Sequence, residues 1–248
     1  MKAILTYHSI DDSGSPISIP ERVFRRHIEW LAAHGPPVVT MAELLRLPHD
    51  APAVAITFDD AFANFADTAW PVLRDHRVPV TLYVPTDHVG GTNTWGGSAE
   101  AGIPSLPIMD WDGVTRVAGE GVTIGSHTCT HPHLPRLPRA QMVDELVGSA
   151  ERIESMIGER PAGLSYPYGA YDEYTVSAAV STYEHACTTE LRPLNTDDEP
   201  HRLPRLDMYY MQTDGMIEAW GTARLRMYLR ARASGRRCRE LLISVSNR

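Results

Sequence analysis

Residues 53–60 read AVAITFDD, an unbroken apolar run that is rich in β-branched residues and ends in two adjacent carboxylates, Asp59 and Asp60. A short continuous run of this kind is typical of a buried strand in a parallel sheet. In βα barrels the loops at the carboxyl ends of such strands converge and carry the active site. The run therefore predicts a parallel sheet and places a pair of acids where chemistry would take place.

Similar runs recur along the chain and alternate with helical periodicity, which is the signature of βα units and a mostly parallel sheet. Besides residues 53–58, strands are expected at 3–8, 38–39, 80–84, 122–126, 163–165, 185–188 and 202–206. Residues 86–107 are rich in Gly, Thr, Ser and Pro and should form a long loop, which in a compact domain is usually functional or mobile. This many units in one chain predict an α/β barrel, which need not be regular.

Helices are expected between these strands. Ser18 and Thr40 are each followed three residues later by a glutamate, which is the spacing of a capping box. Apolar residues at helical spacing predict the longest helix over residues 142–157, and a final helix is expected over residues 216–233.

The net charge, the apolar runs and the cysteines of the chain exclude several classes of protein. The chain has 248 residues and a formal net charge of -8, which argues against a nucleic-acid partner because phosphate binding needs a basic face. No run approaches the roughly 18 apolar residues that a membrane helix needs, and the first residues lack the features of a signal peptide. Three cysteines form no CxxC pair, which fits a reducing compartment, so we expect a cytoplasmic protein.

Two histidines follow the strand expected at residues 122–126. His127 and His131 are four residues apart, so a helical turn or a tight loop can bring both imidazoles to one ion. With an aspartate from another strand end they would form a three-ligand site that leaves positions open for water and substrate. The simpler interpretations are an aspartate that caps the next helix and a structural histidine. Cys129 and His133 fit a small buried residue and a surface residue better than metal ligands.

Three segments, in this order, resemble the motifs of the polysaccharide deacetylases, the fourth family of carbohydrate esterases. They are Thr57-Phe58-Asp59-Asp60, His127-Thr128-Cys129-Thr130-His131 and Tyr166-Pro167-Tyr168-Gly169. Three motifs in order are far more specific than any one of them, and the resemblance extends over roughly residues 3–207. It implies a single domain with the distorted, TIM-like (β/α) barrel of that family.

The resemblance also implies roles for these residues. A divalent metal ion would be held by Asp60, His127 and His131. Asp59 would be the general base. The backbone N–H of Tyr168 would help to hold the oxyanion, and its ring would border the sugar, with Tyr166 and Pro167 as further residues of the substrate-binding motif. Nitrogen and oxygen ligands suit zinc, cobalt, nickel or manganese, and zinc is the default expectation.

Two features depart from the family pattern. Ser165 stands where the third motif usually begins with an arginine that supports the base, and Arg205 is the candidate to supply this charge from another strand. No histidine follows His201 in the sequence, so the usual C-terminal general acid is missing. Residues 5–10 (LTYHSI) resemble the first strand of the biofilm poly-N-acetylglucosamine deacetylases, a branch with circularly permuted motifs, and this resemblance assigns the acid to His8. Otherwise His8 would be interpreted as a core histidine bonded to the backbone.

Residues 1–214 would then form the catalytic domain, and residues 215–248 a C-terminal helical extension that packs on the barrel or trails it. The arginines of this extension are Arg224, Arg226, Arg230, Arg232, Arg236, Arg237 and Arg239. One interpretation is a solvated helix face that balances an acidic body. The other is a docking patch for an anionic membrane surface or for the phosphates of a nucleotide sugar. In the cytoplasm the substrate would be a small N-acetylated sugar, a lipid-linked sugar or a biosynthetic intermediate.

Together these inferences predict a metal-dependent hydrolase that removes the N-acetyl group from an N-acetylglucosamine-type sugar, oligosaccharide or polysaccharide. Water activated by the metal would attack the amide, Asp59 would take its proton, and His8 would protonate the amine. Two alternatives remain open. The same fold and metal could serve an O-acetyl esterase or an amidase whose substrate is not a sugar. The missing third-motif arginine favours instead a carbohydrate-binding pseudoenzyme, whereas the intact Asp59 opposes it.

Overall fold

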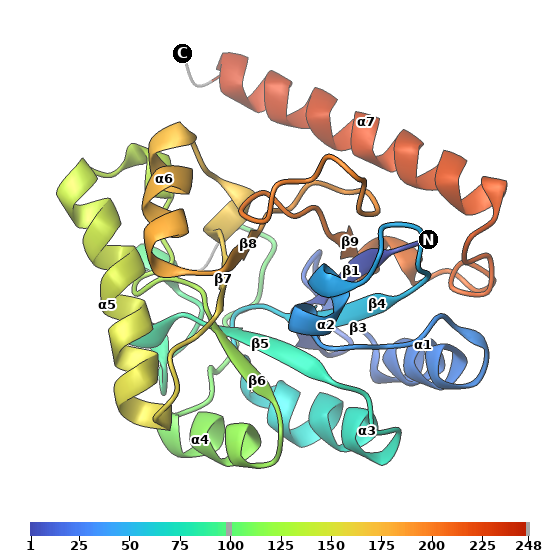
Figure 1. Ribbon diagram of the computed structural model, residues 1–248, viewed down its shortest axis with the longest axis horizontal. Coiled ribbons are helices and arrows are strands. Elements are labelled where there is room, and N and C mark those ends of the chain that lie inside the picture. The colour runs from blue at the N-terminus through green and yellow to red at the C-terminus, as the bar shows by residue number, and fades with distance from the viewer. Residues whose placement is uncertain (98–100, 247–248) are drawn as a thin grey trace.

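The computed structural model describes the backbone of residues 1–97 and 101–246, and the side chains of residues 1–95, 97 and 101–235. Its centre is a curled sheet of seven parallel strands in the order β8-β7-β6-β5-β4-β1-β9 (Figure 1). These strands are β1 (Ala3–Tyr7), β4 (Val54–Phe58), β5 (Val80–Val84), β6 (Thr123–Ser126), β7 (Gly163–Ser165), β8 (His185–Cys187) and β9 (Leu206–Asp207). A separate ribbon pairs β2 (Ser9–Ile10) with β3 (Ser18–Ile19).

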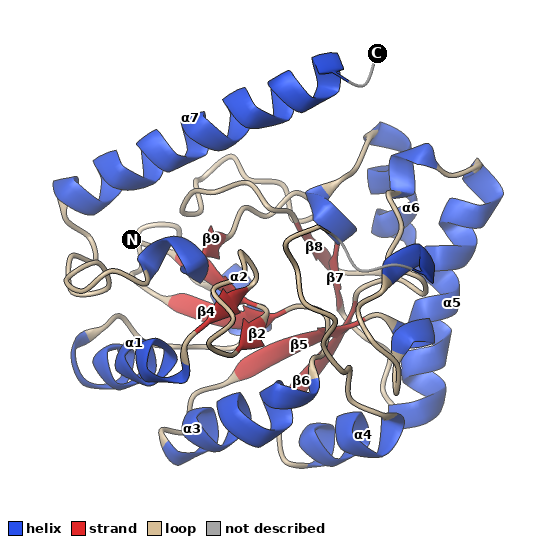
Figure 2. Ribbon diagram, turned by 180° about the vertical axis from the view of Figure 1, so that it is seen from behind, coloured by secondary structure: helices blue, strands red, loops and turns tan. Residues whose placement is uncertain are grey.

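Helices surround the sheet, as expected for βα units. They are α1 (Glu21–His34), α2 (Met41–Arg46), α3 (Trp70–Asp75), α4 (Trp111–Gly119), α5 (Arg139–Ile157) and α6 (Glu173–Thr182) (Figure 2). The last helix, α7 (Ala223–Ser246), runs along one edge of the molecule (Figures 1 and 2). None of the described helices combines the length and the apolarity that crossing a membrane requires. The single α/β domain with a TIM-like barrel that the sequence predicts is confirmed.

β4 is the strand that the apolar run before the two carboxylates predicts, and every one of its residues is buried. It pairs with β1 on one side and with β5 on the other. Phe58 directly precedes Asp59 in the chain, and Tyr7 of β1 stacks on its ring with the centroids 5.1 Å apart. Neighbouring strands and aromatic packing therefore fix the end of β4, and with it the position of the two carboxylates.

Residues 203–207 span the gap between the two ends of the sheet. Leu203 bridges to Cys187 of β8, and β9 pairs with β1. The segment between these contacts carries Arg205, whose side chain is 1% exposed. The closure of the sheet therefore brings a buried guanidinium into the barrel from the C-terminal part of the domain.

The two expected capping boxes have different outcomes. At α2 the Thr40 hydroxyl accepts a hydrogen bond from the Glu43 N–H, and the Glu43 carboxylate accepts one from the Thr40 N–H, as predicted. The box at Ser18 is wrong, because Ser18 lies in β3 and α1 begins after Pro20. Proline presets φ near the helical value, so α1 starts there without a side-chain cap. The strand expected at residues 38–39 is reduced to an isolated bridge between Val38 and β4.

The final helix begins at Ala223 rather than at residue 216. Gly221 adopts a φ of 76°, which interrupts a continuous helix at this point. The Thr222 side chain then accepts a hydrogen bond from the Leu225 N–H, the kind of contact that caps a helix N-terminus. Local turn chemistry therefore moves the start of the helix away from the position that apolar spacing predicts.

α7 packs on the barrel through its first turns. Leu225 and Leu229 are buried there and belong to the same core as the sheet. The exposed arginines among the described side chains of this helix are Arg224, Arg226, Arg230 and Arg232. The side chains of Arg236, Arg237 and Arg239, which the sequence also singles out, lie outside the described residues, as does that of Cys238, one of the three cysteines.

Candidate active site

Three buried side chains meet at the carboxyl ends of β4 and β6. Asp60 lies just beyond β4, His127 directly follows β6, and His131 lies in the loop after it. The Nε2 atoms of His127 and His131 lie 3.4 and 3.5 Å from Asp60 Oδ1. One candidate ligand atom from each residue lies within 4.8 Å of the others. The structure thus brings together the three residues that the sequence selects as metal ligands.

The polar atoms of this triad fit a bound cation. Asp60 Oδ1 and His131 Nδ1 are buried but make no hydrogen bond, although buried polar atoms are almost always paired. His127 Nδ1 lies 2.7 Å from the Ser165 carbonyl oxygen and can donate to it. This contact leaves Nε2 of His127 as the atom available to a metal. One carboxylate and two imidazoles form a ligand set that zinc and related divalent ions accept.

The charges around the triad also favour a cation. Burial lowers the pKa of His131 to about 3, and the neighbouring His127 acts in the same direction. For His127 the effect of burial is outweighed by the adjacent Asp60 carboxylate and by the charge of Asp59, which raise its pKa. Burial likewise opposes the charge of Asp60, but the two histidines outweigh it and lower the pKa of that carboxyl. A divalent ion would neutralise the negative charge that the two adjacent carboxylates concentrate here.

Backbone strain is concentrated at the same place. Apart from Arg77, the described non-glycine residues with positive φ all lie here. They are Asp60, Ala61, Thr128, His131 and Tyr168, with φ between 53 and 69°. This left-handed conformation costs an L-residue on the order of 1 kcal/mol and persists where the surrounding structure imposes it, often at functional sites. The turns that carry two of the metal-ligand candidates and Tyr168 are therefore set by the whole fold rather than by local preference.

Asp59, the expected general base, is held by Arg205. Hydrogen bonds of 2.7 Å join Nη1 and Nη2 of the guanidinium to Oδ1 and Oδ2 of the carboxylate. The Ser165 hydroxyl accepts from Arg205 at 2.9 Å and donates to Asp59 at 3.2 Å. Burial opposes the charge of Asp59, but the charge of Arg205, followed by that of His127, outweighs it and lowers the pKa of Asp59 well below its usual range. The carboxylate is therefore ionised and oriented.

The geometry explains how the third motif can lack its arginine. Ser165 is small and buried at the end of β7, and the guanidinium of Arg205 lies beside its hydroxyl. The charge that the usual motif would supply from β7 comes instead from the segment that spans β8 and β1. The candidate that the sequence names for this position is thus in contact with the base.

We expect Arg205→Met to lower the free energy of unfolding by about 3–5 kcal/mol, because the substitution leaves the buried Asp59 carboxylate without its partner. The loss should shrink at acidic pH. Without Arg205 the folded-state pKa of Asp59 rises, so protonation at acidic pH removes the unpaired charge. The stability of the variant therefore falls as the pH rises. Urea denaturation at several pH values measures this.

The control for Arg205→Met is Arg202→Gln, which breaks the two surface ion pairs of Arg202, with Glu173 and with Glu199. Surface ion pairs contribute about 0–1 kcal/mol. If the two variants had equal unfolding free energies at neutral pH, the buried Arg205–Asp59 pair would not contribute the stability that its geometry implies.

A cavity of about 180 Å³ contains both groups of residues. It is lined by His8, Ile17, Asp59, Asp60, Asn93, Trp95, Ile103, His127, His131, Tyr168 and Thr189. His8 directly follows β1, and its Nε2 atom lies 3.8 Å from Asp59 Oδ2. Its side chain is 22% exposed, so it borders the cavity instead of lying wholly in the core. The expected base, acid and metal ligands therefore share one cavity, which we call the active-site cavity.

Asn93, Trp95 and Ile103, which come from the segment expected to form a long loop, line one wall of the active-site cavity. Asn93 is 3% exposed, and its side chain accepts a hydrogen bond of 2.8 Å from the Leu106 N–H across the loop. Trp95 stacks on His131, with ring centroids 4.3 Å apart and planes at 25°. Loop composition signals a functional segment, but no short motif singles out Asn93, because its position depends on packing between distant residues.

Within the third motif, Tyr168 lines the cavity, whereas Tyr166 and Pro167 do not. The Tyr168 ring lies edge-on to His131 and stacks on His133, with centroids 4.7 and 4.0 Å apart. Tyr166 is fully buried and its hydroxyl donates to a backbone carbonyl, and Pro167 is also buried. Tyr166 and Pro167 thus shape the turn that presents Tyr168.

Two solved structures have the same fold. The structure of IcaB from Ammonifex degensii gives a TM-score of 0.73 at 21% identity, covering 89% of this chain and 97% of that one. The Streptococcus pyogenes deacetylase PplD in complex with acetate gives a TM-score of 0.70 at 21% identity, covering 83% of this chain and 91% of that one. The chain therefore has the TIM-like barrel fold of these two proteins.

Sequence comparison narrows this class. The family model described as polysaccharide deacetylase matches residues 46–184, more than half of the chain. A poly-β-1,6-N-acetyl-D-glucosamine N-deacetylase of Staphylococcus aureus is 30% identical over 219 residues, covering 82% of this chain and 72% of that protein. The protein of the same name from Staphylococcus epidermidis is 22% identical over 217 residues, with the same two coverages. The chain belongs to the polysaccharide deacetylase family, and the resemblance to the biofilm branch is confirmed.

Proposed function

We propose that the protein hydrolyses the N-acetyl group of an N-acetylglucosamine-type sugar with the help of a divalent metal ion. The main support is an ionised, oriented Asp59 beside the triad of Asp60, His127 and His131, in one cavity with His8. A binding module would need neither a buried base nor the guanidinium that holds it. The N-deacetylase names of the staphylococcal relatives support the same reaction.

Each group of the site has a place in amide hydrolysis. A divalent ion held by the triad would polarise the acetyl oxygen and make water more acidic. Asp59 accepts the proton of the attacking water, and Arg205 keeps this carboxylate ionised and oriented. The backbone N–H of Tyr168 donates to the oxyanion that develops on the acetyl group, an effect that is usually the largest contribution to the rate. His8 gives a proton to the departing amine nitrogen, which assists cleavage of the C–N bond.

The test measures acetate and free amine after the protein is incubated with N-acetylglucosamine oligomers, first without metal and then reloaded with zinc or cobalt. We expect equal amounts of acetate and amine, and activity that depends on reloading. Acetate from acetylated xylan without new amine would indicate an O-acetyl esterase instead. Metal binding without product from any sugar would favour an amidase of another substrate or a pseudoenzyme.

A further inference from the structure

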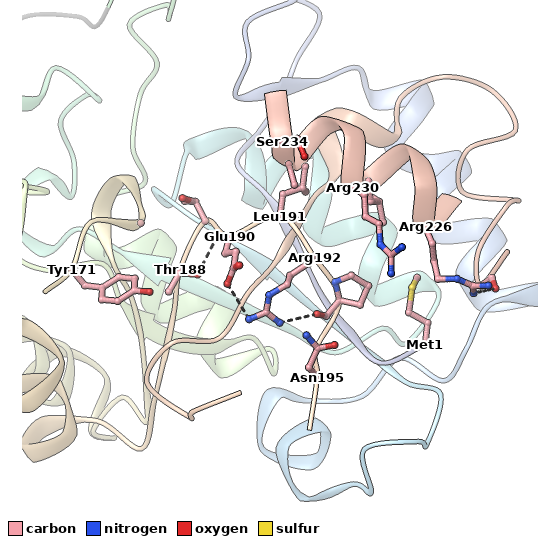
Figure 3. A pocket seen from close by; sticks show the side chains of 16 residues that line it. Met1, Tyr171, Thr188, Glu190, Leu191, Arg192, Asn195, Arg226, Arg230 and Ser234 are labelled. Atoms are coloured by element: carbon pink, nitrogen blue, oxygen red, sulfur yellow. Dashed lines mark hydrogen bonds and ion pairs between the residues drawn. The ribbon is translucent and has the colours of Figure 1, made fainter. Parts of the chain in front are cut away.

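A second cavity, of about 960 Å³, lies between α7 and the loop at residues 188–195 (Figure 3). Arg226 and Arg230 line it from α7, and Arg192 and Glu190 line it from the loop. Figure 3 shows Arg226 and Arg230 extending from the same side of the helix, as their i, i+4 spacing requires. Because guanidinium groups dominate its charged lining, we call it the arginine cavity.

Arg226 and Arg230 are the arginines of this cavity that have no ion pair with a described carboxylate. Glu190 pairs with Arg192 at 3.0 Å, and Arg192 also pairs with Asp198 at 2.6 Å. Among the residues whose side chains the structure describes, no carboxylate forms an ion pair with Arg226 or Arg230. Arg226 donates to the Gly221 carbonyl oxygen at 2.6 Å, a contact that leaves its charge unneutralised. The chain as a whole carries a net charge of -8, so two guanidiniums without a described carboxylate partner in one cavity indicate a site for an anion.

α7 is held firmly where it borders the arginine cavity. Leu225 and Leu229 are buried in the main core, and the Tyr228 hydroxyl donates to a backbone carbonyl at 2.8 Å. These contacts fix the two helical turns that carry Arg226 and Arg230. Such preorganisation lowers the entropic cost of binding a ligand.

The arginine cavity adjoins the active-site cavity. Thr189 lines both of them. Gly169 lines the arginine cavity, and its neighbour Tyr168 lines the active-site cavity. A Cβ atom on Gly169 would clash with Thr189, so the two segments are in close contact at this junction. A ligand that extends from the active-site cavity past Thr189 therefore enters the arginine cavity.

The size of the active-site cavity limits what it can hold. Its volume of about 180 Å³ is below the roughly 300–1,000 Å³ of pockets that enclose small molecules. It has room for an acetamido group and its sugar ring, so further substituents must extend into a neighbouring cavity. A third cavity, of about 940 Å³, lies beside Trp95 and Tyr168, and no described arginine or lysine lines it. An anionic substituent would favour the arginine cavity.

We propose that the substrate is an N-acetylated amino sugar that carries a phosphate ester, and that Arg226 and Arg230 bind its phosphate while the acetamido group lies beside Asp59. The identity of the sugar rests on the proposed function. Guanidinium groups match phosphate oxygens in both charge and geometry. The same phosphate chemistry occurs in a sugar phosphate and in the diphosphate of a nucleotide-linked or lipid-linked sugar.

The test compares the binding of N-acetylglucosamine 1-phosphate with that of neutral N,N′-diacetylchitobiose by calorimetry. The full chain is used without metal, so that the phosphate cannot bind the metal site instead. We expect the double variant Arg226→Gln/Arg230→Gln to lower the ratio of the two affinities by about tenfold or more, because two charge-assisted contacts are lost. The matched control is Arg22→Gln/Arg224→Gln, which removes two exposed arginines that do not line the cavity, and its ratio should equal that of the wild type.

Turnover of the reloaded enzyme separates this inference from the proposed function. If the double variant has a lower kcat/KM for the phosphorylated sugar, relative to the neutral one, this result supports phosphate binding in the arginine cavity. If the double variant lost phosphate binding and the reloaded wild type released no acetate, the arginine cavity would be supported and the proposed deacetylase activity would be overturned. Equal affinity ratios in the double variant and the wild type would overturn the cavity and leave deacetylation standing. Tighter binding of UDP-N-acetylglucosamine than of the 1-phosphate would support the cavity and identify a diphosphate as its ligand.

Discussion

Asp59→Asn is expected to slow acetate release by about 100- to 10,000-fold, the range that a positioned general base contributes. Asparagine keeps the shape of the side chain but cannot accept the proton of the attacking water. His8→Ala is expected to lose activity over the same range, because the amine then departs without a proton donor. Both variants should still bind metal, since neither residue belongs to the triad. The measurements are the rate of acetate release and the metal content per chain.

Stability is measured beside activity in this experiment. Asp59→Asn leaves the buried Arg205 guanidinium without its carboxylate, so this variant should unfold more easily, and rates are compared where both proteins are folded. His34→Ala, at the exposed end of α1, is the control for His8→Ala and should retain full activity. Normal turnover by His8→Ala would refute its role as the acid, and normal turnover by Asp59→Asn would refute the assigned base.

Asp60→Asn and His131→Ala are expected to weaken zinc binding by at least about 100-fold, because loss of a residue that merely supports a ligand already costs about 10- to 100-fold. Competition with a chromophoric chelator measures the affinity. Asp59→Asn is a closely matched control, since it makes the same substitution at the adjacent position and spares the triad. Cys129→Ser should bind zinc normally, because the Cys129 sulfur faces the backbone of α5.

Zinc affinity that survives Asp60→Asn would mean that other side chains hold the metal, and the triad would have to be abandoned. Weakened affinity in Asp59→Asn to the same extent would instead assign both aspartates to the ion. Loss of affinity in Asp60→Asn alone would separate metal binding from proton transfer at two neighbouring carboxylates, which sequence alone cannot do.

The placement of the metal-ligand candidates could be predicted because each lies in a short segment at a strand end. Residues 53–58 have the pattern of a buried strand, so the position of Asp59 and Asp60 at the carboxyl edge of a sheet follows from local pattern. His127 and His131 follow another such strand. Parallel packing then brings the two strand ends to one place, as observed.

The sequence could nominate Arg205 as a partner of Asp59, but it could not establish the contact. The pair joins positions 146 residues apart in the chain, and it depends on how residues 203–207 span the sheet. The same holds for Asn93, Ile103 and Thr189, which line the active-site cavity without any motif of their own. Such positions are decided by tertiary packing, which a single sequence does not display.

Two predicted helix starts differ from the structure, and in each case a nearby residue is the cause. The expected capping box at Ser18 fails because Pro20 sets the start of α1, and the final helix starts late because Gly221 interrupts it. In both places a residue with special backbone preferences outweighs the side-chain pattern around it.

Residues 203–207 come late in the amino-acid sequence, and this has a consequence for biosynthesis. A nascent chain that has left the ribosome only through β8 already contains the triad and Asp59, yet no guanidinium lies beside the base. The contacts around Asp59 are complete only when residues 203–207 have been synthesised and β9 can pair with β1. A prematurely terminated translation product would therefore carry every candidate metal ligand and still lack the guanidinium that orients the base.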